Sequence, residues 1–172
     1  MMGFSRSLLQ QATRVTLMAL CLFSFQPAYA GGHPINDSVA LNGLKEVKIV
    51  YLIDFPHPQR TDGYLKDIEA TRQGYLKQGV EPKMVLVFQG ETVKYLTRNP
   101  DEMLVFEYEK ELNSIAETIA RFKGYGVRME ICSVATAYFK VDNQTVLPGM
   151  TVVGDSSISM VGWQYQGYKA VY

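Results

Sequence analysis

Cysteine is scarce in this sequence, with Cys21 and Cys132 the two examples in 172 residues. Histidine is equally scarce, and neither sign of charge is in excess, because 17 basic side chains face 17 acidic ones. Balanced charge argues against a nucleic-acid-binding protein, and 47% hydrophobic residues argue against a disordered one. The sequence also contains no P-loop, no G-x-S-x-G and no G-x-G-x-x-G after an expected strand. The sequence therefore lacks the common motifs of nucleotide-binding proteins and of serine hydrolases, which argues against both classes.

The first thirty residues predict a secretory signal peptide. They contain Arg6 and Arg14, no acidic residue, and an apolar stretch over 15–23 before the cleavage motif Ala28-Tyr29-Ala30. The apolar stretch is half as long as the ~20 residues of a membrane-spanning helix, so we expect cleavage after Ala30 and no membrane attachment afterwards. The mature protein would then be periplasmic or secreted.

Cleavage would leave residues 31–172, with 15 basic and 17 acidic side chains and Cys132 as the single cysteine. A chain of this length can bury one core, and one cysteine excludes an internal disulfide. An unpaired thiol is unusual in an oxidising compartment. We expect residues 31–45, which are rich in Gly, Asn and Asp, to form a flexible lead, and residues 46–172 to form the folded domain.

Apolar runs alternate with helical periods along the mature chain and predict an α/β fold. Asp62 is expected to cap the first helix and Gly79 to end it. Strands alternating with helices predict a parallel sheet covered by helices on both faces. The expected strands are 47–53, 83–88, 127–132, 151–153 and 169–172, and the expected helical segments are 61–78, 91–98, 107–122, 133–139 and 156–165.

Ligands of open parallel sheets bind at the carboxyl ends of the strands. Cys132 is the one intrinsically nucleophilic residue at these ends, and the N–H groups of the helix that follows it would favour its thiolate. A free cysteine at the end of a core strand is also commonly a small buried side chain, so position alone leaves both interpretations open. The other residues expected at this edge, as a pocket, are Asp54, Gln89, Gly90, Ser133, Gly154, Asp155 and Ser156.

Other arrangements of reactive residues are weaker candidates. His57 lies between two prolines and His33 lies in the lead, so neither is expected to serve Cys132 as a base. Glu107, Glu109 and Glu111 are spaced two apart on a helix, which is typical of a solvated face rather than of paired catalytic acids. The 11 Tyr and 8 Phe lack interleaved basic residues, so we assign them to the core and to contacts in a homo-oligomer.

Four segments carry a family resemblance: 86–96 (LVFQGETVKYL), 126–132 (GVRMEIC), 147–153 (LPGMTVV) and 166–171 (QGYKAV). In this order and spacing they resemble the DsrE/DsrF-like proteins, in register from about Val47 to Tyr172. The resemblance implies a flavodoxin-like three-layer α/β sandwich on a five-stranded, mainly parallel sheet. It also implies assembly as a trimer or hexamer.

For function, the resemblance implies sulfur relay. Cytoplasmic sulfurtransferases of this family carry a cysteine at the end of the third strand that accepts sulfur as a persulfide, and Cys132 occupies that position. Partners would be proteins that donate and accept sulfur, and no cofactor is expected. This chain differs from those members in its expected export. The alternative is a non-catalytic module that binds a small ligand or supports assembly, in which Cys132 only packs.

Cleavage after Ala30 would create a further possible site at the new amino terminus. Gly31, Gly32 and His33 would supply an α-amine, two amide nitrogens and an imidazole nitrogen, a set that suits Cu(II) or Ni(II). The alternative is a flexible tail whose small residues merely suit the peptidase. We therefore expect metal uptake in vitro without assigning it a biological purpose.

Overall fold

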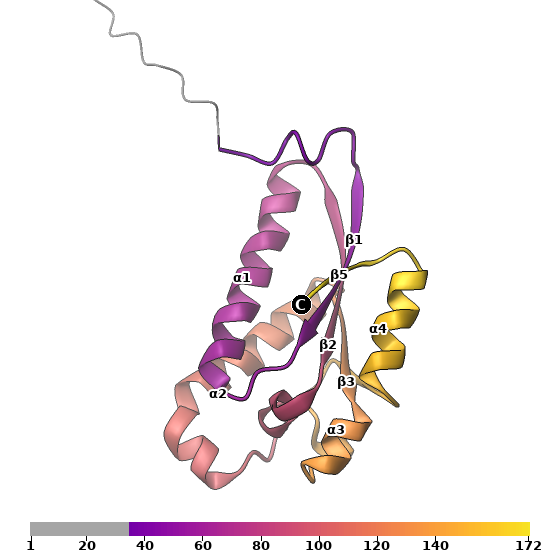
Figure 1. The fold of residues 1–172 in the computed structure, drawn as a ribbon. Helices are drawn as coiled ribbons and strands as arrows, with labels where there is room; N and C mark the ends of the chain where they lie inside the picture. Colours follow the sequence, from indigo (N-terminus) through magenta and orange to yellow (C-terminus); the bar gives the residue numbers. More distant parts are fainter. Residues whose placement is uncertain (1–34) are drawn as a thin grey trace, which may run out of the picture. The chain divides into compact units, whose positions relative to one another are not determined.

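The computed structural model describes residues 35–172, and its centre is a five-stranded parallel sheet (Figure 1). The order of strands across the sheet is β4-β3-β2-β1-β5, and all four pairings between them are parallel. The expected signal peptide and the candidate metal ligands Gly31, Gly32 and His33 lie outside the described residues. The strands are β1 (Glu46–Ile53), β2 (Glu81–Phe88), β3 (Arg128–Cys132), β4 (Met150–Val153) and β5 (Lys169–Val171).

Helices lie on both faces of the sheet, which confirms the expected three-layer α/β sandwich (Figure 1). One face is covered by α1 (Pro58–Lys77) and α2 (Glu102–Gly124), and the other by α4 (Ser156–Tyr165). At the carboxyl end of the sheet lie the 3-10 helix η1 (Gly90–Tyr95) and the short helix α3 (Ser133–Tyr138), and a second 3-10 helix, η2 (Asn143–Thr145), precedes β4.

The two faces of the sheet carry cores of very different size. The α1/α2 side holds a large cluster that includes the fully buried Leu65, Phe88 and Phe122. The α4 side holds a small cluster of four buried residues, Val50, Val85, Val87 and Met160. Burial of apolar area is the main favourable term in folding, so α1 and α2 are anchored more strongly by apolar contacts than α4 is.

The first helix begins earlier than expected. Thr61 was the expected start and Asp62 the expected cap, but α1 begins at Pro58 and its N-cap residue is His57, which makes no side-chain capping bond. Proline suits the first helical position, because its fixed φ fits and its missing N–H would have had no partner there. Asp62 lies inside the helix and pairs with Lys66, with Oδ2 and Nζ 2.7 Å apart. Gly79, at φ +75°, follows the helix end as expected.

The second long helix also extends beyond its expected start. It begins at Glu102 rather than Glu107, and Asp101 caps it by accepting a hydrogen bond from the Met103 N–H at 2.9 Å. Tyr108 has a non-helical φ of −133°, which separates a short first piece from the long second piece. This break obscured the helical period in the sequence. The expected helix over 91–98 is the shorter 3-10 helix η1.

The described part of the expected lead, residues 35–45, contains turns but neither helix nor strand. Asp37 and Gln78 exchange two hydrogen bonds, from the Asp37 N–H at 2.9 Å and from Gln78 Nε2 at 3.1 Å, which join this part to the end of α1. Within residues 35–172, no helix combines the length and the apolar character that crossing a bilayer requires.

The difference in burial between two side chains predicts how their truncation to alanine changes the free energy of unfolding. Leu65→Ala should lower the free energy of unfolding by about 3 kcal/mol, because the side chain is 0% exposed and its loss leaves a cavity. Met103→Ala, at a side chain 68% exposed, should change it by less than about 0.5 kcal/mol. Urea unfolding followed by circular dichroism measures both. Equal effects would contradict the assignment of Leu65 to the core.

Candidate functional site

Cys132 is the last residue of β3 and the N-cap residue of α3. Its side chain is buried, with 4% of its surface exposed, and Sγ accepts a hydrogen bond from the Ser156 N–H at 3.4 Å. Ser156 is the first residue of α4, so the sulfur lies against the beginnings of two helices. Free N–H groups at helix starts favour a negative charge nearby.

A chain of hydrogen bonds links the thiol to the ends of two other strands. The Ser156 hydroxyl donates to Gln89 Oε1 at 2.6 Å, and Gln89 Nε2 donates to Asp54 Oδ2 at 3.2 Å. Asp54 follows β1, Gln89 follows β2 and Cys132 ends β3. The carboxyl ends of three adjacent strands therefore converge on one polar network.

The remaining residues of the expected pocket lie around this network. Gly90 has φ +56°, and a Cβ atom added there would lie 1.9 Å from Asp54 Oδ1, so a residue with a side chain would displace Asp54. The Ser133 hydroxyl donates to the Gly154 carbonyl at 2.8 Å, which joins the start of α3 to the turn before α4. Asp155 caps α4 by accepting from the Ser157 N–H at 2.7 Å.

Opposing effects act on the ionisation of the thiol. Burial of Cys132 penalises the charged form and acts to raise its pKa. The Ser156 side chain and the backbone N–H groups of Ala135, Ser156 and Val134 stabilise the thiolate by hydrogen bonding. These bonds together outweigh burial, so the pKa of Cys132 lies below its ordinary value.

Of these donors, the backbone N–H groups are the dependable ones. The Ser156 hydroxyl has a single proton, which in the structure is directed to Gln89 and would have to turn to reach the sulfur. The Ser156 N–H has no such alternative, and it points at Sγ. The site is thus a buried thiol with fixed amide donors, an arrangement that suits a nucleophilic sulfur.

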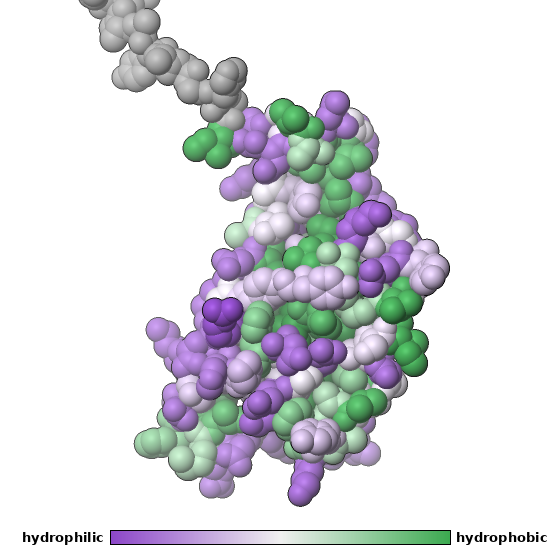
Figure 2. All heavy atoms as spheres, in the orientation of Figure 1, coloured by the Kyte–Doolittle hydropathy of each residue, from purple (hydrophilic) through white to green (hydrophobic). Residues whose placement is uncertain are grey.

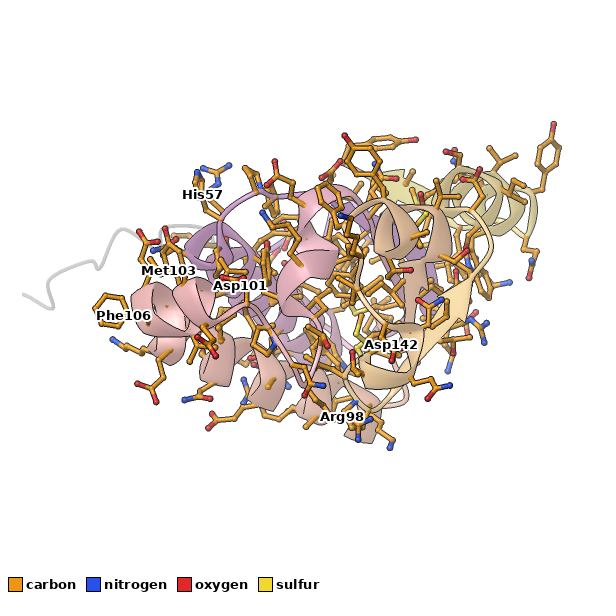
Figure 3. All side chains as sticks on the ribbon, turned by 90° about the horizontal axis from the view of Figure 1, so that it is seen from below. His57, Arg98, Asp101, Met103, Phe106 and Asp142 are labelled. Carbon is orange, nitrogen blue, oxygen red and sulfur yellow. The ribbon has the colours of Figure 1, made fainter. Side chains whose placement is uncertain are left out.

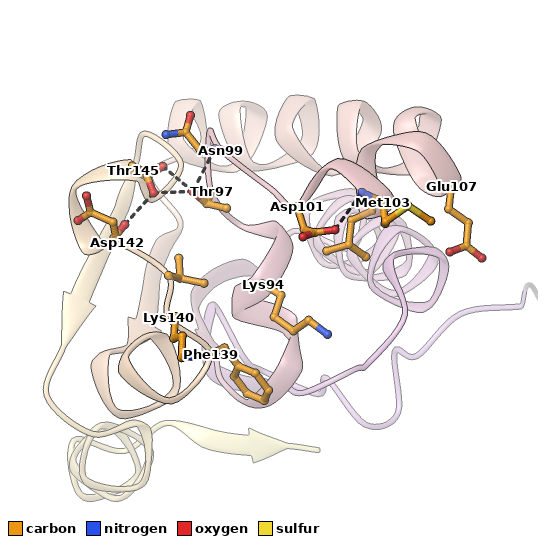
Figure 4. A pocket seen from close by; sticks show the side chains of 12 residues that line it. Lys94, Thr97, Asn99, Asp101, Met103, Glu107, Phe139, Lys140, Asp142 and Thr145 are labelled. Atoms are coloured by element: carbon orange, nitrogen blue, oxygen red, sulfur yellow. Dashed lines mark hydrogen bonds between the residues drawn. The ribbon is translucent and has the colours of Figure 1, made fainter.

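A hollow separate from the Cys132 site lies at the same end of the sheet, and Cys132 is not among its lining residues (Figure 4). Its volume is about 760 Å³, and it lies between η1, the first piece of α2 and the segment that follows α3. In Figure 3, Phe106 points outward beside Met103 on one side, whereas Asp142 and Arg98 lie on the other. The lining combines two lysines, three carboxylates, three neutral polar side chains and four apolar ones: Lys94, Thr97, Asn99, Asp101, Met103, Leu104, Glu107, Phe139, Lys140, Val141, Asp142 and Thr145.

Sequence reasoning missed this hollow because its walls are loops and a broken helix. The unexpected first piece of α2 supplies Met103 and Leu104, and the residues after α3 carry no periodic pattern. One signal was available in the sequence, since Asn99-Pro100-Asp101 is a typical turn before a helix start. Among the described residues, no group of three or more His, Cys, Asp or Glu side chains is arranged to bind a metal ion.

Comparison with known proteins identifies the fold and a family. The model of the DsrE/DsrF-like family matches residues 60–172. Protein MTH1491 of Methanobacterium thermoautotrophicum, a protein of unknown function, is 18% identical with a TM-score of 0.57, and the YchN protein of E. coli is 17% identical with a TM-score of 0.53. Each alignment covers 73% of this chain and 97% of the other. No curated protein sequence matches this chain significantly.

The close approach of Gly90 to Asp54 generates a prediction. Gly90→Ala should lower the free energy of unfolding by about 1–2 kcal/mol, because alanine is strained at φ +56° and its Cβ would push Asp54 away from Gln89. The matched control is Gly74→Ala inside α1, where an added Cβ meets nothing within 4 Å and helix propensity improves by up to about 1 kcal/mol. Urea unfolding of both variants checks this. A neutral Gly90→Ala would show that the Asp54–Gln89 contact is not built as described.

Proposed function

This protein belongs to the DsrE/DsrF-like family, and on that premise we propose that it carries sulfur as a persulfide on Cys132 and transfers it to another thiol. The observation that carries the proposal is the Ser156 N–H directed at Cys132 Sγ at 3.4 Å, at the junction of β3 with α3. It supports a thiolate at the position where the sulfurtransferases of this family have their sulfur-accepting cysteine.

The proposed step moves one sulfur atom without net oxidation. The Cys132 thiolate attacks the terminal sulfur of a persulfide on a donor, a new S–S bond forms at Sγ, and the S–S bond of the donor breaks. The electron pair of that bond leaves with the donor sulfur as a thiolate. In the second step an acceptor thiolate attacks the terminal sulfur now held by Cys132, and Cys132 leaves as a thiolate.

The fixed donors suit both steps. A thiolate is the nucleophile of the first step and the leaving group of the second, and a leaving thiolate departs faster when its pKa is low. The Ser156 N–H and the backbone N–H groups of Val134 and Ala135 lower the pKa of Cys132 in both cases. Two exposed residues lie close to Cys132 along the sheet edge: Val134, two residues later in the chain, and Gly154, which follows the β4 residue paired with Cys132. We propose that a donor approaches over them.

Location and partners form part of the same proposal. We propose that the protein is exported, because residues 1–30 have the composition of a signal peptide. Its sulfur donor and acceptor would then work in the same compartment. Binding of Cu(II) or Ni(II) at Gly31, Gly32 and His33 stays a separate proposal that depends on cleavage after Ala30.

A second candidate function is a module that binds a small ligand, with Cys132 as a packing residue. Two observations favour it: 96% of the Cys132 surface is buried, and the hollow of about 760 Å³ has no contribution from the thiol. In this case the mixed lining of Lys94, Lys140, Asp101 and Glu107 would hold a ligand with both charges. The two functions differ in whether native Cys132 reacts.

Mass spectrometry after exposure to a sulfane-sulfur donor separates these functions. The native protein should gain the mass of one sulfur atom, and Cys132→Ser should gain none. The alkylation rate of Cys132 should rise with pH and reach half its maximum at a lower pH than that of an ordinary cysteine thiol, because the thiolate reacts and the pKa of Cys132 is lowered. No gain of sulfur, together with a thiol that alkylates only after unfolding, would favour the ligand-binding module.

We also propose a homo-oligomer, a trimer or hexamer. Exposed apolar side chains lie along the outer face of α4, where Ile158, Val161 and Tyr165 are spaced three and four residues apart (Figure 2). Exposed apolar patches on soluble proteins often mark interaction sites, so we propose that other copies of this chain bury this face of α4.

Light scattering on residues 31–172 tests this assembly. The measured mass should exceed that of a monomer at micromolar concentration, and Ile158→Lys should reduce it by placing a charge in the interface. Phe106→Lys, at an even more exposed position on α2, should leave the mass unchanged. A monomeric native protein would contradict the proposal, and so would an equal response to both substitutions.

A further inference from the structure

Glu130 is a buried carboxylate in the middle of β3, with 2% of its surface exposed. Its neighbours Met129 and Ile131 face the large core, so Glu130 faces the opposite side, where α4 lies. Burying a charge is costly unless the group is paired and hydrogen-bonded, so such a residue needs a structural or functional reason.

Two of the three hydrogen bonds of this carboxylate come from α4, and the third comes from Arg128 on its own strand. Oε2 accepts from the Ser159 hydroxyl and, at 3.1 Å, from Trp163 Nε1, and both residues lie on α4. Oε1 accepts from Arg128 Nε at 2.6 Å. The Arg128 guanidinium also lies 5.4 Å from the centre of the Trp163 ring, so Arg128 contacts both Glu130 and the Trp163 side chain.

The same face of α4 carries the contact with the thiol. Ser156, Ser159, Met160 and Trp163 follow one another at helical spacing, and Ser156 and Met160 are buried. Glu130 therefore holds α4 one and two turns away from the N–H that meets Cys132 Sγ. Because the apolar core under α4 is small, these polar bonds supply a large part of what fixes the position of the helix.

We propose that Glu130 is a positioning residue, which through Ser159 and Trp163 holds α4 so that the Ser156 N–H stays aligned with Cys132 Sγ. The proposal rests on the sulfur-carrier function proposed above and adds the device that maintains its nucleophile. A hydrogen bond weakens steeply with distance and angle, so a small slide or tilt of α4 would remove the donor from the sulfur. The thiolate would then lose part of the stabilisation that opposes its burial.

Trp163→Phe and Ser159→Ala test the positioning of α4 by Glu130 without changing any charge. Both variants keep every charged group of the protein, including Glu130 with Arg128 on β3, Asp155 before α4, and Asp54 behind Gln89. Each variant removes one donor to Glu130. We expect the pKa of Cys132 to rise in both, and the alkylation rate at neutral pH to fall about three- to tenfold, since a hydrogen bond to a charged group corresponds to about a tenfold change in an ionisation constant.

Gln164→Ala is the matched control, because Gln164 lies on the exposed side of α4 and bonds the Met160 carbonyl of its own helix. It should leave the pH profile of alkylation unchanged. Circular dichroism confirms that each variant is folded; if Trp163→Phe does not fold, the Ser159→Ala profile decides. Unchanged profiles in the folded variants would overturn the proposal.

Sulfur loading of the native protein, measured alongside, separates the two levels of the argument. If native protein takes up no sulfur but the variants raise the pKa of Cys132, the sulfur-carrier function fails and the positioning by Glu130 stands. If native protein takes up sulfur and the variants leave the profile unchanged, the positioning fails alone.

Discussion

The parallel register of the three central strands is the constraint on which the candidate site depends. Ile53 of β1 pairs with Phe88 of β2, and Phe88 pairs with Ile131 of β3, so the next residues along these strands emerge in a row. These next residues are Asp54, Gln89 and Cys132. A slip of one residue in any strand would turn its side chains to the opposite face of the sheet and break the hydrogen-bonded chain.

The two faces of the sheet differ in role: one holds most of the apolar core, and the other carries the helix α4, which contacts the thiol. The large core under α1 and α2 accounts for most of the buried apolar surface, whereas α4 covers a cluster of four buried residues. A helix with so little apolar anchoring depends on polar bonds for its position, and Glu130 supplies them from β3. Of the two helices that begin beside the thiol, α4 is thus the one that Glu130 hydrogen-bonds directly.

The thiol and the large hollow lie at the same end of the sheet but use different elements. Cys132 is enclosed by the beginnings of α3 and α4, whereas the hollow is enclosed by η1, the first piece of α2 and residues 139–145. The helix α3 contributes to both, because its N-cap residue is Cys132 and its C-cap residue, Phe139, lines the hollow. A molecule bound in the hollow would therefore contact the end of the helix whose first N–H groups serve the sulfur.

The sequence by itself determined the strands, the parallel α/β class and the row of residues at the strand ends, because apolar runs of strand length and a following turn are local signals. Tertiary structure decided the rest. The start of α1 at Pro58 and the break at Tyr108 depend on capping and packing that override the period of the side chains. The partners of Glu130 and of Cys132 on α4 lie 24 to 33 residues away along the chain, and no local pattern specifies which side chains long-range packing brings within a hydrogen bond.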